Sequence, residues 1–432
     1  MKKKISNWGN YPVIESDEFI PISENQIVDY LKQKSEVIAR GNERCYGDAN
    51  LNQNSISLLK LNHFISFDPN NGIIECEAGT LLSDILEFIV PKGFFLPVTP
   101  GTKFITLGGA VASDVHGKNH HINGCFSDHV QEITIINSMG ETIKCSPQEN
   151  KELFWATIGG MGLTGIITRV TFRLKKIETA YIKHEAIKAE NLDQIFQLFE
   201  ESDKWTYTVA WIDCLQKGNH IGRSILFRGE HATLNEINEN QKKSPLELKP
   251  KLKLNVPIMF PNFVLNSLTV KVFNFLYYNK QFSKKIKNII DYNTFFYPLD
   301  AIENWNKIYG KQGFIQYQFV IPKEGGKEGM EQILQTIANS GQGSFLAVLK
   351  LFGKNNPLAY NSFPFEGYTL ALDFKVTKTL PSLVKKLDEL VEKYGGRIYR
   401  AKDSLSKPSL LNYLKNIESD KFNSIQNKRI NP

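Results

Sequence analysis

The sequence ECEAGTLLSDILEFIVPKGFFLPVTPGTKFITLGGAVASDVHGKNHH, residues 75–121, decides the fold of this chain. It opens on the end of an apolar strand and continues into an amphipathic helix, which Pro91 and Gly93 are expected to stop. The glycine pair Gly108 and Gly109 follows, and then a loop with three histidines. The loop could be a metal site, a catalytic loop or neither.

Length and composition are those of a globular protein with a large core. The chain has 432 residues, of which 41% are hydrophobic and 22% are charged, close to the averages for soluble domains. That length predicts two or three domains. No run of about 18 apolar residues occurs, so a membrane-spanning helix is not expected.

The N-terminus and the cysteines predict a cytoplasmic location. The basic start MKKK is followed by Asn7, Trp8 and Gly9, where a secretory signal needs an apolar segment. The five cysteines are odd in number and form no CxxC pair, which favours reduced thiols over a disulfide framework. The net charge of +7 is modest for this size, so a basic binding surface has to be sought locally.

Two glycine-rich stretches lead to different interpretations. GMGLTG, residues 160–165, has the spacing of the GxGxxG dinucleotide fingerprint, but a predicted helix precedes it and a predicted strand follows. A Rossmann site needs the opposite order, so that interpretation is rejected. In ARGNERCYGDAN, residues 39–50, Gly41 and Gly47 allow tight turns whose backbone N–H groups can hold an anion. An ordinary loop between strands is the alternative there.

The second half of the chain has a different pattern from the first. Residues 15–180 are predicted to be mainly short strands and turns, with two helical pieces. Later, aromatic and β-branched runs such as WTYTVAWID (205–213) and YTLALDF (368–374) predict strands. Amphipathic segments such as LPSLVKKLDELVEKYGG (380–396) predict helices between them. We therefore expect an α+β domain over 181–396.

Three motifs in a fixed order carry a resemblance to a known family. RGNERCYGD (40–48) precedes the 75–121 stretch, and ELFWATIGGMGLTGIITRVTFRL (152–174) follows it. This layout resembles the FAD-binding domain of the vanillyl-alcohol-oxidase (PCMH) type and, within that superfamily, the decaprenylphosphoryl-β-D-ribose 2′-oxidase family. The similarity continues through YPLDAIENWNKIYGKQGFIQYQFVIP (297–322) and GGRIYRAKDS (395–404), so it covers nearly the whole chain.

The resemblance implies a fold and an activity. The fold would be α+β with two domains: an FAD-binding domain over 1–180, completed by 397–432, and a substrate domain over 181–396 on an antiparallel sheet. The activity would be FAD-dependent oxidation of the 2′-hydroxyl of a polyprenylphosphoryl-β-D-ribose to a ketone, with the hydride passing to flavin N5. This is the first half of an epimerisation that makes the arabinose donor of cell-wall polysaccharide, and an NAD-dependent keto-reductase would be the partner.

Two other functions stay open: a soluble sugar or polyol oxidase of the same superfamily, and a flavin-binding partner protein without turnover.

The same resemblance implies the cofactor site. The loop at 40–48 would wrap the FAD pyrophosphate, the segment at 100–116 would hold the other half, and the glycines would let backbone approach closely. The expected FAD-binding residues are Arg40, Gly41, Asn42, Glu43, Arg44, Cys45, Tyr46, Gly47, Pro100, Gly101, Thr102, Thr106, Gly108, Gly109, Ala112, Ser113, His116, Gly117, Asn119, Gly162, Gly165, Ile166, Ile167 and Lys402.

The mode of FAD attachment follows from one position. Arg44 stands where covalent members of the superfamily have the histidine that is bonded to the flavin. Because arginine cannot form that bond, non-covalent FAD is expected, with Cys45 and Cys125 as weaker attachment points.

Oxidation of a secondary alcohol requires a hydride acceptor and a group that receives the hydroxyl proton within hydrogen-bond reach. By resemblance the catalytic candidates are Lys402, His116 and Tyr46. Lys402 comes first, because a desolvated lysine can lose its proton and a charged one can stabilise the reduced ring. The expected substrate-binding residues are Tyr297, Gln316, Gln318, Lys350, Thr369 and Ala371. Thr369 and Ala371 replace an asparagine and a cysteine of mycobacterial members, so this lining departs from the family.

A metal site is the weaker interpretation of the histidine loop. His120 and His121 are neighbours that point apart in most conformations, and no cysteine or carboxylate cluster accompanies them. No metal is therefore expected. Only His116 is expected to face the flavin and the substrate, with Lys118 and Asn119 supporting the turn.

One segment suggests contact with a membrane surface. Residues 242–290 contain ten lysines and one acid, Glu247, with aromatic residues interleaved. Basic charge with exposed aromatics suits an anionic bilayer, which would place the chain peripherally on the inner membrane. A solvated face of an ordinary helix is the alternative, and nucleic acid is not expected as a partner, because no nucleic-acid motif accompanies the charge.

Overall fold

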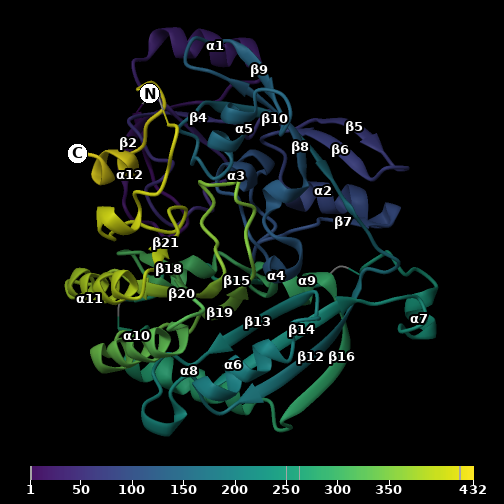
Figure 1. Ribbon diagram of the computed structural model, residues 1–432, viewed down its shortest axis with the longest axis vertical. Helices are drawn as coiled ribbons and strands as arrows, with labels where there is room; N and C mark the ends of the chain where they lie inside the picture. The colour runs from purple at the N-terminus through teal and green to yellow at the C-terminus, as the bar shows by residue number, and fades with distance from the viewer. Residues whose placement is uncertain (1, 250, 262, 418–419) are drawn as a thin grey trace.

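The computed structural model describes residues 2–249, 251–261, 263–417 and 420–432. They form two stacked bodies: an upper body that holds both termini, and a lower body built on a wide sheet (Figure 1). In the described residues, no helix is long and apolar enough to span a membrane.

A four-stranded sheet begins the upper body, with the strands in the order β1 (Lys2–Ile5), β2 (Ile14–Phe19), β4 (Asn54–Ser57) and β3 (Ile38–Arg40). Strand β1 pairs antiparallel with β2, and the other pairs are parallel. Helix α1 (Glu24–Gln33) connects β2 to β3. Ser23 caps its first turn, and its buried face packs into the core of the upper body.

A five-stranded antiparallel sheet completes the upper body, with the strands in the order β5 (Phe64–Asp68), β6 (Ile73–Glu77), β10 (Ile166–Arg173), β8 (Val130–Ile136) and β9 (Thr142–Cys145). Strands β8 and β9 form a hairpin, as the two β-rich runs of VQEITIINSMGETIKC (130–145) predict, and Gly140 takes a φ of +83° in its turn. A short pair, β7 (Phe94–Phe95) with β11 (Lys175–Lys176), lies beside it.

Helices α2 (Leu82–Ile89) and α5 (Lys151–Thr157) are the two helical pieces expected in this region. Because α5 precedes β10, the order is helix, glycine turn, strand, which agrees with the rejection of a Rossmann site. The structure adds α1, α3 (Leu107–Ala112) and α4 (His120–Asn123), so the expectation of only two helices was wrong. Two of the six residues of α3 are glycines, which disfavour helix; packing stabilises it instead, since a Cβ at Gly108 would lie 2.8 Å from the Ala78 Cβ.

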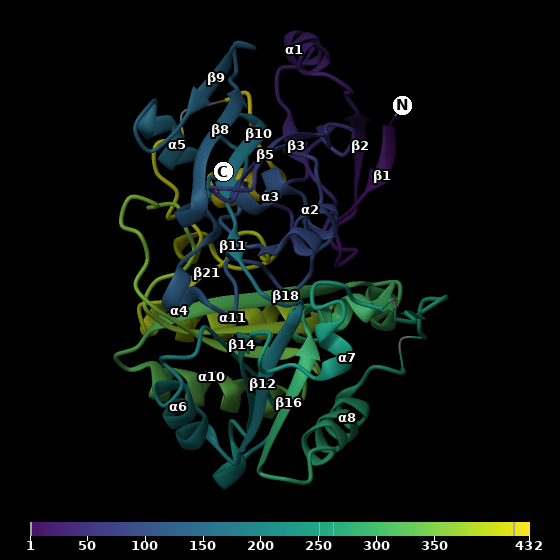
Figure 2. The same ribbon diagram turned by 90° about the vertical axis from the view of Figure 1, so that its right-hand side faces the viewer.

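The lower body contains an eight-stranded sheet. Its strands run in the order β16 (Lys285–Asp291), β12 (Tyr181–Ala189), β14 (Ser224–His231), β13 (Tyr207–Ile212), β19 (Ala347–Phe352), β20 (Gly367–Lys375), β18 (Phe314–Pro322) and β21 (Arg397–Ile398). All of its pairings are antiparallel. Helices α6 (Leu192–Glu200), α10 (Gly326–Ser340) and α11 (Leu380–Lys393) pack on one face, and the other face is turned toward the upper body (Figure 2).

Smaller elements border this sheet: α7 (Glu239–Lys242), β15 (Leu254–Asn255), α8 (Ser267–Asn279), α9 (Tyr292–Phe296) and β17 (Ile302–Glu303); the last helix is α12 (Ile425–Ile430). After β21 the chain returns to the upper body, where Arg429 of α12 forms ion pairs with Asp48 and Asp403. We propose the domain division 1–180 with 397–432, and 181–396. Membership of the sheets supports it, although β21 itself pairs with β18.

Candidate active site

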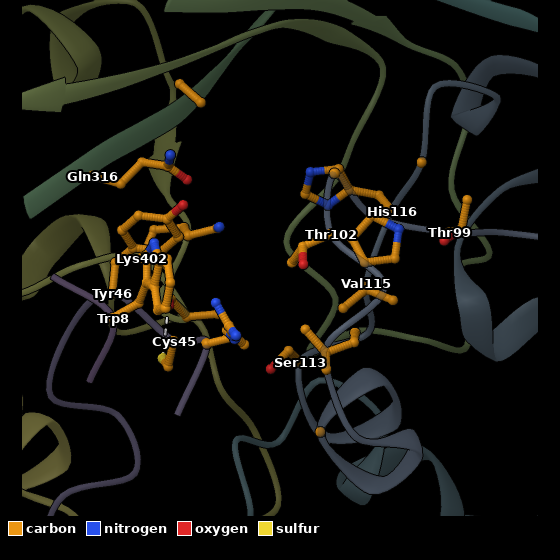
Figure 3. A pocket seen from close by; sticks show the side chains of 18 of the residues that line it. Trp8, Cys45, Tyr46, Thr99, Thr102, Ser113, Val115, His116, Gln316 and Lys402 are labelled. Carbon is orange, nitrogen blue, oxygen red and sulfur yellow. Dashed lines mark hydrogen bonds between the residues drawn. The ribbon is translucent and has the colours of Figure 1, made fainter. Parts of the chain in front are cut away.

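A cavity of about 610 Å³ lies between the upper body and the free face of the eight-stranded sheet. Both bodies supply its walls (Figure 3). The predicted site residues that line it are Arg40, Gly41, Asn42, Glu43, Arg44, Cys45, Tyr46, Pro100, Gly101, Thr102, Thr106, Gly108, Gly109, Ala112, Ser113, His116, Gly117, Gly162, Gly165, Ile167, Gln316, Gln318, Lys350, Ala371 and Lys402.

Five predicted residues do not line the cavity but support its wall from behind. The hydroxyl groups of Tyr297 and Thr99 form a hydrogen bond of 2.6 Å, and Thr369 donates to the Phe319 carbonyl. Asn119 donates to the Pro97 carbonyl, and Ile166 lies in the core of the upper body. A Cβ at Gly47 would lie 1.5 Å from the Asp403 carbonyl oxygen, so this glycine is needed for chain packing.

Three glycines shape a cradle for a cofactor. A Cβ at Gly101 would meet nothing within 4 Å, one at Gly162 would meet only the Ile38 Cδ1 at 3.7 Å, and one at Gly109 only the Thr106 Oγ1 at 3.0 Å. Such carbons would occupy the cavity itself, so these positions fit a flat, extended group held against backbone. FAD is such a group.

Gly41 serves a different purpose from the one inferred from sequence. A Cβ there would lie 2.2 Å from the Thr106 Oγ1, so its absence lets the first loop pack on α3. The loop is anchored further by Arg40, which forms a buried ion pair of 2.9 Å with Glu18, and by Asn42, which donates to the Phe104 carbonyl. This anchoring preorganises the loop before any ligand binds.

The first loop also contains the position at which covalent members of the superfamily attach the flavin, which is Arg44 here. The Arg44 guanidinium lies 3.9 Å from the centroid of the Trp8 ring. The Cys45 thiol donates to the Ala401 carbonyl at 2.7 Å, and burial raises its pKa to about 11. Burial also holds the pKa of Cys125 well above its usual value. Both thiols are therefore protonated at neutral pH and poor nucleophiles.

Lys402 stands at one side of the cavity with Tyr46 and Gln316 (Figure 3). Its Nζ is 4.1 Å from the centroid of the Tyr46 ring. Burial lowers the pKa of Lys402 to about 8, against the opposing charge of Asp373. Burial holds the pKa of Tyr46 well above 10, so this phenol stays protonated. Lys402 is thus the group on this side that can exchange a proton near neutral pH.

Asp373 is a functional candidate that the sequence analysis missed. It is fully buried behind the cavity wall, and burial raises its pKa to about 7. Gln316 donates to its Oδ1 at 2.6 Å. A lone acid inside the otherwise apolar strand YTLALDF was the available signal, because Asp is rarely buried without a partner.

His116 lies across the cavity from Lys402 (Figure 3). The Gln318 Nε2 lies 3.0 Å from the His116 Nε2 and donates to it, which leaves the proton of the ring on Nδ1. Burial, aided by the charge of Lys350, holds the pKa of His116 well below its usual value, so the ring is neutral. Nδ1 has no hydrogen-bond partner in the described structure and is available to a bound ligand.

The other histidines of the loop turn to separate partners. The ring centroid of His120 lies 4.6 Å from that of Phe352, and the His121 Nε2 lies 2.8 Å from the Trp205 carbonyl oxygen. Across the described ranges, no group of three or more histidine, cysteine or acidic side chains is placed to hold a metal ion. All five cysteines are free.

Two further lysines, Lys118 and Lys350, line the cavity. Burial lowers the pKa of both Lys118 and Lys350 to about 7. The Lys118 Nζ donates to the carbonyls of Phe295 and Phe296. An anionic ligand beside them would favour their charged forms, so they suit a phosphate better than a neutral sugar.

The comparisons with known proteins agree with this site. Residues 20–146 match the family described as FAD binding domain. With the glycine cradle and the adjacent lysine, this match makes the chain an FAD-dependent oxidoreductase of the vanillyl-alcohol-oxidase type.

Individual relatives narrow the class of protein further. The decaprenylphosphoryl-β-D-ribose oxidase of Mycolicibacterium smegmatis is 36% identical over 414 residues, which cover 93% of this chain and 89% of the relative. The chain belongs to the decaprenylphosphoryl-β-D-ribose oxidase family. An uncharacterized protein from the mprA 5′ region of Streptomyces coelicolor is 28% identical over 76% of this chain and 90% of its own. The D-lactate dehydrogenase of Anaerostipes hadrus is 33% identical over 28% of this chain and 26% of its own length.

Proposed function

We propose that the protein oxidises the 2′-hydroxyl of a polyprenylphosphoryl-β-D-ribose to the 2′-keto sugar, as the first half of an epimerisation. The observation that carries the proposal is the placement of Lys402, with a pKa of about 8, on the same cavity as the glycine cradle. The name of the Mycolicibacterium relative supports the substrate class. When bound, FAD supplies the acceptor for the hydride.

The side chains around the cavity have separate proposed roles. Neutral Lys402 accepts the proton of the reacting hydroxyl, while Gln316 and Gln318 orient the ribose through their amides. His116 donates from Nδ1 to a sugar oxygen and orients it. Lys350 and Lys118 hold the phosphate. FAD is held without a covalent bond by the loop at 40–46, by 100–117 and by Gly162.

Anaerobic bleaching of the flavin tests this function. A polyprenylphosphoryl ribose should bleach it, and free ribose or other free sugars should not. Bleaching by free sugars would instead identify a soluble sugar oxidase. If no alcohol bleached the flavin, the result would favour a flavin-binding partner protein without turnover. A matched polyprenylphosphoryl arabinose, which differs only at the 2′-carbon, controls for binding without correct presentation of the hydroxyl.

We further propose an NAD-dependent keto-reductase as the partner that completes the epimerisation, and a peripheral position on the inner face of the membrane. The exposed side of α8 supports the latter. Val270, Asn274 and Tyr278 bury one face of this helix, whereas Leu268, Val272, Phe275 and Leu276 on another side are 50–69% exposed. A surface helix with an apolar solvent side, set among lysines, suits an anionic bilayer.

A further inference from the structure

The face of the eight-stranded sheet that lines the cavity changes from polar to apolar in one direction. Cross-strand pairing aligns Gln318 of β18 with Ala371 of β20, Ala371 with Val348 of β19, and Val348 with Trp211 of β13. All four residues line the cavity. Three strand spacings separate the first residue from the last, roughly 14 Å. This row of four residues therefore begins with Gln318, beside the proposed ribose site, and ends with the aromatic ring of Trp211.

Beyond this row the cavity continues as an apolar limb. It is lined there by Val209 and Trp211 of β13 and by Phe227 of β14, on which the neutral ring of His184 of β12 stacks. Tyr277 of α8 closes its outer side, with its ring centroid 4.7 Å from that of Trp211. The Trp211 Nε1 donates to the Phe345 carbonyl at 3.1 Å, so the one polar atom of that ring is already satisfied. The Trp211 ring therefore presents apolar surface to the limb and no free hydrogen-bond donor.

Lys350 stands where the polar and apolar parts meet. It lies two residues after Val348 on β19 and projects from the same face of the sheet. Its ammonium therefore lies between the ribose site and the limb. The ribose, the phosphate and the polyprenyl tail of the proposed substrate would lie in that order along the sheet. The ribose would lie beside Gln318, the phosphate beside Lys350 and the tail in the apolar limb.

We propose that this apolar limb, from Val348 through Trp211 to Tyr277, binds the first isoprene units of the polyprenyl tail and leads the tail out beside α8. The inference rests on the proposed function, because it assigns a subsite to that substrate. It also explains why the limb reaches α8, whose solvent side is apolar. The tail would pass from the limb toward the bilayer that we propose this helix contacts.

Calorimetric titration of the FAD-loaded protein with isopentenyl, geranyl and farnesyl phosphate tests the subsite without redox chemistry. The affinity of the wild type should rise with chain length, by tenfold or more from isopentenyl to farnesyl phosphate, because one methylene in an apolar pocket contributes about tenfold or more. Tyr277→Ala and Trp211→Ala should each lose about tenfold for farnesyl phosphate and keep the weak affinity for isopentenyl phosphate. Phe64→Ala, an exposed aromatic on β5, should bind like the wild type.

Equal affinity for the three phosphates in the wild type, or unchanged farnesyl phosphate binding in Tyr277→Ala, would overturn the inference. Tyr277 lies on a helix at the edge of the cavity, so this variant remains informative even if Trp211→Ala misfolds. Failure of the proposed function gives a different pattern: chain-length-dependent phosphate binding without bleaching by any polyprenylphosphoryl ribose. Bleaching with no dependence on chain length would retain the function and remove the tail subsite.

Discussion

The Gln316 Nε2 donates a 2.6 Å hydrogen bond to the Asp373 Oδ1, and this pair connects the cavity wall, where we propose that ribose binds, to a buried carboxyl group. The Tyr309 hydroxyl donates to the other carboxyl oxygen, the Asp373 Oδ2, at 3.4 Å. Asp373 also interacts electrostatically with Lys402, whose pKa it raises against the effect of burial. Asp373 is thus a positioning residue for the amide and sets the proton affinity of the amine.

The pH profile of flavin reduction should report this coupling. If neutral Lys402 is the base, the reduction rate should rise with pH through about 8. The Asp373 carboxylate favours the ammonium form, so Asp373→Asn should lower the apparent pKa and shift the profile to lower pH. Stopped-flow reduction across pH 6–10 measures this. A profile that falls above pH 8 would mean that the ammonium form is the active one.

Removal of Lys402 should impair chemistry more than cofactor binding. The proposed FAD contacts are spread over several backbone segments, so Lys402→Ala should retain the flavin spectrum. A positioned proton acceptor contributes about 10²- to 10⁴-fold, so anaerobic reduction should slow by at least about 10²-fold. His116→Ala should lose less, because its proposed role is orientation. Lys378→Ala, an exposed lysine, is the control. The reverse order of the two losses would reassign the base, and apoprotein from Lys402→Ala would make it a cofactor anchor.

The flavin should be released on denaturation. Arg44 stands at the position of the bonding histidine, and burial raises the pKa of Cys45 to about 11 and that of Cys125 well above its usual value. Thiols held protonated are poor nucleophiles toward a flavin. Acid precipitation should therefore leave yellow colour in the supernatant. Fluorescence that stays with the denatured chain on a gel would contradict this.

Reagents that target a pocket thiol should leave the native chain unmodified at residues 368–374. Ala371 occupies the cavity wall there, and burial raises the pKa of Cys76 and Cys214 to about 12. Intact-mass analysis and peptide mapping check this. Ala371→Cys is the matched positive control and should gain one adduct in that peptide, because its side chain would face the cavity. An adduct at 368–374 in the wild type would refute the assignment.

The apolar side of α8 should bind anionic vesicles. Replacing Phe275 and Leu276 by serine should reduce sedimentation with phosphatidylglycerol vesicles and leave FAD binding intact, since both side chains point to solvent. Leu358→Ser, which changes an exposed leucine elsewhere, should sediment like the wild type. Point variants are preferable to removal of residues 242–290, because β16 in that segment pairs with β12. Equal pelleting of all forms would exclude this surface.

Much of the upper body follows from local sequence. Three of its features could be predicted from the sequence: the hairpin of β8 and β9, helix α2 before Gly93, and the order of helix before strand around Gly162. They could be predicted because turn chemistry and hydrophobic periodicity act over a few residues. Helix α3 was not predicted, because its glycines disfavour helix and contacts with residues distant in the sequence, such as the packing of Gly108 on Ala78, hold it in place.

By itself, the sequence determined local features such as the β8–β9 hairpin and helix α2. It also predicted the FAD-binding loops and the candidates Lys402, His116 and Gln318, since these reside in motifs and in the family resemblance. Only the tertiary structure decided that Asp373 lies behind Gln316, that Tyr297 and Thr369 support the wall from behind, and that an apolar limb extends to α8. The reason is strand order. Periodicity tells which residues share a face of one strand, whereas long-range pairing selects which strands become neighbours and so which side chains meet.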